Sequence, residues 1–96
     1  MMVLITYDVD TISEDGQKRL RKVAKICQNF GQRVQNSVFE CLLTEVQFIK
    51  IRNELETVID EKLDSIRFYF LGNHWKRRVE TLGKKTSIDF TNELII

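Results

Sequence analysis

The sequence predicts an α+β domain with elements in the order β-α-β-β-α-β. Three observations lead to this fold class. Two segments carry apolar residues at helical spacing, runs of strand-forming residues surround them, and turn or capping residues mark most boundaries. The chain has 96 residues, which is enough for one domain with a modest core.

The first strand is expected over residues 2–9, because VLITYDV is rich in strand-forming side chains. Residues 11–14 have the form of a capping box, so a helix should begin near Ser13. We expect Gly31 to end this helix as a C-cap. The helix buries one apolar stripe at the spacing i, i+3, i+4, i+7, formed by Leu20, Val23, Ala24 and Cys27.

Residues 33–43 are expected to form two short strands joined by a turn at 35–37. A second capping box at residues 44–47 begins a helix over 45–60. Residues 65–71 alternate strongly and form the fourth strand, which Gly72 and Asn73 end. This order is the ferredoxin-like arrangement, an antiparallel sheet with both helices on one face. The fold alone does not specify a function.

Residues 1–72 therefore form a ferredoxin-like core, and residues 73–96 are an extension of it. A fifth strand is expected around residues 78–82, and apolar pieces follow at 87–90 and 94–96. Since the core is already complete, the extension needs another surface. We expect it to add as a strand to the open sheet edge of a second subunit.

Composition points to a soluble, cytoplasmic protein. The chain is 43% hydrophobic and 30% charged. It has no signal-peptide pattern and no apolar run near the ~18 residues of a membrane span, so no membrane partner is expected. Cys27 and Cys41 lack the spacing of a zinc or CxxC motif and are expected to be buried thiols.

The formal net charge is only +1, but the charges are unevenly distributed. Residues 40–64 hold seven acidic and three basic residues, and a further basic cluster lies at residues 76–78. Such asymmetry is typical of an anion-binding face. The segment 16–39 contains no acid and six basic residues, namely Lys18, Arg19, Arg21, Lys22, Lys25 and Arg33.

Three stretches together resemble the second CRISPR-associated protein family. They are YDVD at 7–10, KRLRKVAK at 18–25 and GQRVQNSVFEC at 31–41, and the last is the most specific. The resemblance covers nearly the whole chain. It implies a homodimer formed through the sheets, which bridges two dimers of the CRISPR integrase and holds double-stranded DNA during spacer acquisition. Many members of that family are described as magnesium-dependent nucleases acting on DNA or RNA.

The resemblance implies that Asp8 is the metal ligand and catalytic residue. In a two-fold dimer, each chain would supply its own Asp8 near the axis. Mg²⁺, or Mn²⁺ as a substitute, is commonly held by one or two carboxylates with waters and phosphate oxygens. The alternative is a strand-end carboxylate that caps backbone amides. Asp10 is expected to shape the turn or cap the helix.

Arg19, Arg21 and Arg33 are the expected phosphate contacts, and Lys18 and Lys22 are weaker ones. The alternative for each is a solvated side chain. Helix spacing separates Arg19 from Arg21, so the two could hold different phosphates.

Three more residues are candidates for supporting roles. Tyr7 faces away from Asp8 if the strand alternates strictly, so it belongs to the core or contacts substrate. Ser37 either donates a hydrogen bond near the metal or makes the turn. Phe39 is a core residue or a base-stacking platform. His74, the only histidine, is not expected to be catalytic.

Two functions from different classes remain open. One is a dimeric metal-dependent endonuclease, and the other is a non-catalytic DNA-binding scaffold for the integrase. An RNA-recognition module is disfavoured, because its aromatic sheet consensus is absent. A toxin-type ribonuclease would predict growth arrest on expression.

Overall fold

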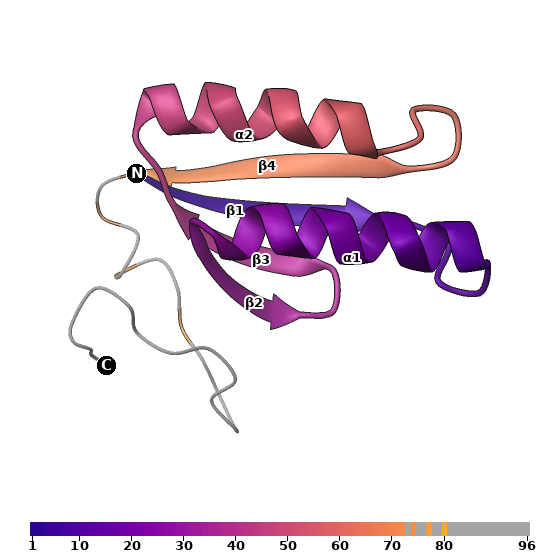
Figure 1. The fold of residues 1–96 in the computed structure, drawn as a ribbon. Helices are drawn as coiled ribbons and strands as arrows, with labels where there is room; N and C mark the ends of the chain where they lie inside the picture. Colours follow the sequence, from indigo (N-terminus) through magenta and orange to yellow (C-terminus); the bar gives the residue numbers. More distant parts are fainter. Residues whose placement is uncertain (73, 75–76, 78–79, 81–96) are drawn as a thin grey trace.

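The computed structural model of the chain describes residues 1–72, 74, 77 and 80. The predicted order β-α-β-β-α-β is confirmed (Figure 1). The elements are β1 (Met2–Asp8), α1 (Glu14–Gln28), β2 (Gly31–Gln35), β3 (Val38–Leu42), α2 (Glu45–Val58) and β4 (Ser65–Gly72).

The four strands form one sheet in the order β2-β3-β1-β4, and every neighbouring pair is antiparallel. β1 is central, so its residues have partners on both sides. Ile5, for example, lies opposite Phe39 of β3 and Phe68 of β4. This is the predicted ferredoxin-like sheet.

Both helices pack on one face of the sheet. Alternation along β1 buries Val3, Ile5 and Tyr7 toward the helices. These three residues belong to one hydrophobic core cluster, which also contains Leu20, Val23, Ala24 and Cys27 of α1 and Ile51 and Leu55 of α2. Burying a large apolar side chain contributes roughly 1.5–3 kcal/mol. We call the opposite face, which carries Leu4, Thr6 and Asp8 of β1, the open face.

Side-chain caps begin both helices. Ser13 is the N-cap of α1 and accepts a hydrogen bond from the Gly16 amide at 3.1 Å. The Asp10 carboxylate accepts from the Ile12 amide at 2.8 Å, so Asp10 shapes the preceding turn, as expected. The predicted capping box at Thr44 and Gln47 is confirmed, with both reciprocal hydrogen bonds present.

The predicted role of Gly31 is wrong. α1 ends at Gln28, and Asn29 is its C-cap in right-handed helical geometry. Gly31 is instead the first residue of β2 and lies opposite Cys41. A Cβ there would lie 1.9 Å from the Glu40 carbonyl oxygen, so glycine allows the close approach of β2 and β3.

The remaining boundaries differ from prediction by one or two residues. β2 and β3 are joined at Asn36 and Ser37, and α2 ends at Val58. Gly72, at a φ of 78°, ends β4. The predicted strand at 78–82 and the apolar pieces at 87–90 and 94–96 lie outside the part of the chain just described. No helix in the described part is long and apolar enough to cross a membrane.

Candidate metal and nucleic-acid site

Asp8 is the last residue of β1, and it is exposed on the open face. It lies opposite Ser65, the first residue of β4. Tyr7, one position earlier, is buried toward the helices with 2% exposure. The alternation that the sequence predicted therefore separates these two neighbours, and Tyr7 packs in the core.

Arg67 of β4 shares the open face with Asp8, because it lies opposite Thr6. Its guanidinium Nη1 donates to the Tyr69 hydroxyl at 3.4 Å. That hydrogen bond raises the pKa of Arg67, and the negative charge of Asp8 raises it further. Sequence reasoning missed Arg67. The signal was the alternation of β4, which puts Ser65, Arg67 and Tyr69 on one face.

The described part of a single chain offers few side-chain ligands for a metal ion near Asp8. No group of three His, Cys, Asp or Glu side chains that could hold a metal occurs among the described residues. The carboxylate of Asp10 already accepts a hydrogen bond in its turn. One accessible carboxylate fits Mg²⁺, which prefers oxygen ligands and keeps several waters, better than it fits a metal that needs a full protein cage.

Asp64, immediately before β4, accepts hydrogen bonds from three segments of the chain. Arg19 of α1 donates through Nε at 2.8 Å and through Nη2 at 3.1 Å. The Asp60 amide donates at 3.0 Å. The Tyr7 hydroxyl of β1 also donates to Oδ2. We call Asp64, Arg19, Tyr7 and Asp60 the Asp64 cluster.

The Asp64 side chain is fully shielded from solvent, and that of Arg19 is 17% exposed. Burial alone would raise the pKa of Asp64, but the hydrogen bonds from Arg19, Tyr7 and Asp60 outweigh it and lower that pKa. Burial and the Asp64 carboxylate together raise the pKa of Tyr7 above its usual range, so its hydroxyl remains a donor. The cluster is thus a charged, satisfied network inside the fold.

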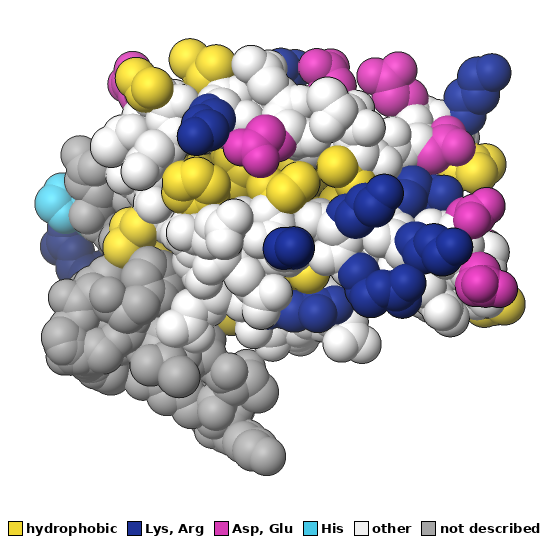
Figure 2. All heavy atoms as spheres, viewed as in Figure 1, with side chains coloured by type: hydrophobic (Ala, Val, Ile, Leu, Met, Phe, Trp, Pro, Cys, Tyr) yellow, Lys and Arg dark blue, Asp and Glu magenta, His cyan; other side chains and the backbone are white. Residues whose placement is uncertain are grey.

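Arg19 and Arg21, which the sequence treats alike, differ in the structure. Arg19 lies at the edge of the buried side of α1 and is held by Asp64. The exposed cations of the helix are at i, i+3, i+4 and i+7, so they share its outer side. Figure 2 shows Lys and Arg side chains gathered over this helix. We call these cations the α1 basic stripe: Lys18, Arg21, Lys22 and Lys25.

Arg33 and Phe39 lie together on the β2–β3 hairpin. Arg33 Nε donates to the Asn36 carbonyl at 2.8 Å, and its guanidinium carbon lies 5.8 Å from the Phe39 ring centroid. Phe39 is fully buried in the core, so no face of its ring is available to a base. The Ser37 carbonyl accepts from the Tyr7 amide at 2.9 Å, which ties the hairpin turn to the end of β1.

The family model "CRISPR associated protein Cas2" matches residues 1–79. The chain belongs to the Cas2 family. It is 59% identical over 95 residues to "CRISPR-associated endonuclease Cas2" of Halalkalibacterium halodurans, covering 99% of both chains. It is 53% identical to "CRISPR-associated endoribonuclease Cas2" of Chlorobaculum tepidum, covering all of both.

The crystal structure of Streptococcus pyogenes Cas2 at pH 6.5 has the same fold, with a TM-score of 0.82 and 64% identity. The match covers 86% of this chain and all of that one. The resemblance drawn from the sequence is therefore confirmed. The names of the Cas2 relatives support a nuclease activity for the family.

The two cysteines of this Cas2 chain are free and buried, as predicted. The Cys41 thiol donates to the Cys27 carbonyl at 3.5 Å. Hydrogen bonding with Cys41 and burial raise the pKa of the Cys27 thiol, so it stays protonated. Neither cysteine belongs to the candidate site.

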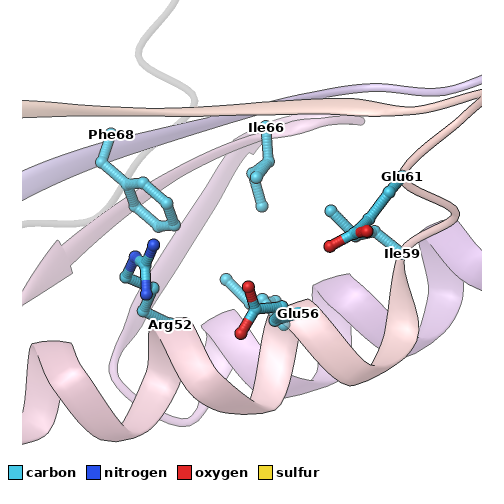
Figure 3. Close-up of a pocket in the computed structure, with 7 residues that line it drawn as sticks. Arg52, Glu56, Ile59, Glu61, Ile66 and Phe68 are labelled. Carbon is cyan, nitrogen blue, oxygen red and sulfur yellow. The ribbon is translucent and has the colours of Figure 1, made fainter.

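A groove of about 320 Å³ lies between α2 and β4. In Figure 3, Ile66 and Phe68 of β4 face Arg52 and Glu56 of α2, with Ile59 and Glu61 at one end. The Phe48 ring of α2 packs edge-to-face against two rings of β4, with centroid separations of 5.2 Å to Phe68 and 5.0 Å to Phe70. The groove is on the helix-covered side of the sheet, so it does not open onto Asp8.

Proposed function

We propose that this Cas2-family chain acts as a homodimeric, magnesium-dependent endonuclease in CRISPR adaptation. The observation that carries the proposal is the exposed Asp8 carboxylate at the end of β1, on the sheet face opposite α1 and α2. Hydrolysis would add one water across a P–O bond and leave a phosphate monoester and a hydroxyl. When bound, Mg²⁺ would polarise the phosphoryl oxygen and acidify a water.

The second carboxylate would come from the partner's copy of Asp8. A two-fold axis at the open face would bring the ends of the two β1 strands together. Arg67, on the same face, would stabilise negative charge on the phosphate oxygens. Asp8 would hold the ion, and Arg67 would orient the phosphate.

The outer strand β4 supports the proposed mode of dimerisation. It is at one end of the sheet order, and the apolar side chains of Ile66 and Phe68 line the adjoining groove. Residues 87–96 of a second copy, which contain two apolar pieces, would add as a strand along β4. This contact would hold two chains together beside their open faces.

The α1 basic stripe favours a second function, that of a DNA-binding scaffold for the integrase. The stripe lies on the outer side of the helix layer, whereas Asp8 lies on the far side of the sheet. One chain therefore does not present both groups to the same phosphate. Binding through the stripe should continue when Asp8 is replaced, and the protein could then bridge two integrase dimers without cutting.

Cleavage assays test the proposal directly. Double-stranded DNA and single-stranded RNA are each incubated with wild type and Asp8→Ala, with Mg²⁺, with Mn²⁺ and with chelator. Both substrates are included because the relatives are named both endonuclease and endoribonuclease. Cleavage that requires metal and is lost in Asp8→Ala supports the enzyme and identifies its substrate.

Equal cleavage by both proteins contradicts the role of Asp8. No cleavage by wild type, together with intact DNA binding, leaves the scaffold as the function. Glu61→Gln is a matched control, because Glu61 is an exposed acid that lines the groove on the helix-covered side of the sheet.

A further inference from the structure

Asp8 is a terminal strand residue, and the ends of strands open more readily than their centres. A shared ion tolerates little movement of its ligands, since effective sites hold their groups within about 0.5 Å. In a two-fold dimer, any displacement of Asp8 occurs twice. A shared metal site at Asp8 therefore requires interactions that hold this end of β1 in place.

The Asp64 cluster lies at that end. Tyr7, which donates to Asp64, is the residue before Asp8 in the chain. Ser65, which follows Asp64, is the cross-strand partner of Asp8. The cluster thus holds the neighbour of Asp8 within β1 and the neighbour of its partner within β4.

Arg19 connects this end of the sheet to α1 through both carboxylate oxygens of Asp64. Such two-point contacts restrict orientation as well as distance. On the other side of β1, the Tyr7 amide donates to the Ser37 carbonyl at 2.9 Å. The residue before Asp8 is therefore held through its side chain on one side and through its backbone on the other.

We propose that Asp64 is the positioning residue of the metal site, fixing Asp8 through Tyr7 and Ser65 and held in turn by Arg19. The proposal rests on the proposed function of Asp8 as the metal ligand. Asp64 does not touch the ion or the substrate. It sets the place of the carboxylate that does.

Asp64→Asn is the primary variant. It preserves the size of the side chain and one acceptor oxygen, but it removes the charge that Arg19 binds. Arg19→Lys is the second variant, because it keeps the positive charge and loses the planar two-point contact. Glu61→Gln is the control: it makes the same change from acid to amide in the same connecting segment, at an exposed residue.

The measurement is Mn²⁺ binding to the full-length protein by isothermal titration, without substrate, at a temperature where circular dichroism shows each variant folded. Asp64→Asn should raise the dissociation constant for Mn²⁺ on the order of tenfold, at the low end for groups that orient metal ligands. Arg19→Lys should shift it in the same direction by less, and Glu61→Gln should leave it unchanged. Combined with Asp8→Ala, Asp64→Asn should have no further effect.

Wild-type Mn²⁺ affinity in folded Asp64→Asn would overturn the proposal. If Asp64→Asn does not fold, Arg19→Lys decides in the same way. Failure of the proposed function looks different: either wild type binds no Mn²⁺, or Asp8→Ala binds it as tightly as wild type does.

Discussion

Arg19 and Asp64, 45 residues apart in the sequence, form a two-point ion pair with contacts of 2.8 and 3.1 Å. The pair joins α1 to the segment that leads into β4. Replacing one partner would leave the other as a shielded charge without its counterion, which is strongly unfavourable. The sequence identified Arg19 as a phosphate contact, whereas the structure gives its guanidinium a partner inside the chain. The structure does not test its contact with nucleic acid, and because Asp64 holds the guanidinium we predict no phosphate contact at Arg19.

Arg19 and Arg21 should therefore affect DNA binding differently. Arg21 belongs to the exposed α1 basic stripe. The logarithm of the association constant for duplex DNA falls linearly with the logarithm of the salt concentration, and Arg21→Ala should make this negative slope shallower by about one. Arg19→Gln should leave the slope unchanged. Fluorescence anisotropy from 50 to 200 mM salt, over which the screening length falls from ~14 to ~7 Å, measures both. If Arg19→Gln made the slope as shallow as Arg21→Ala does, or shallower, this assignment would be contradicted.

The lowered pKa of Asp64 predicts the acid sensitivity of the fold. A carboxylate with a depressed folded-state pKa contributes stability that is complete above its unfolded value of about 3.9. That contribution is lost as pH falls from about 3.9 toward the lower folded-state value. Urea unfolding at a series of pH values should show a shallower loss of stability for Asp64→Asn than for wild type below about pH 4. Parallel profiles would show that Asp64 does not titrate in this way.

Gly31 should resist substitution because of the close approach of β3. The methyl group of Gly31→Ala would lie 1.9 Å from the Glu40 carbonyl oxygen, so the hairpin would have to shift. We expect a loss of about 1–3 kcal/mol in the free energy of unfolding. Chemical unfolding of Gly31→Ala measures it, with Gln28→Ala at an exposed helix position as the control. Equal stability of Gly31→Ala and wild type would mean that β2 adapts without cost.

Phe39 should act through the core and not through base stacking. Phe39→Ala should cost about 3–5 kcal/mol of stability, and Phe39→Leu should cost less. If the ring made no contact with nucleic acid, Phe39→Leu would bind DNA and RNA with wild-type affinity while folded. Weaker binding by folded Phe39→Leu, with an unchanged circular dichroism spectrum, would restore the stacking role.

Much of the fold follows from local patterns. The alternation of β1 and β4, the apolar stripes of both helices and the capping box at Thr44 are short-range signals, and each corresponds to an observed element. Gly31 was misassigned because a glycine after a helix is usually a C-cap. Here its role depends on a strand that approaches from ten residues further along the chain.

The candidate site was less predictable than the fold. The position of Asp8 at the end of a strand could be anticipated, but its meaning came from a family resemblance. Asp64 carries no local signal, because its partners come from β1 and α1 and meet it only in the folded chain. Arg67 could have been found from the alternation of β4, once β4 was placed beside β1.

If two copies of Asp8 share one ion, the stoichiometry of Mn²⁺ binding to the dimer should reveal it. Isothermal titration of wild type and Asp8→Ala is combined with ultracentrifugation, which establishes that both proteins are dimers at the concentration used. We expect one Mn²⁺ per two chains for wild type and no binding for Asp8→Ala. One ion per single chain, or binding that persists in Asp8→Ala, would contradict it.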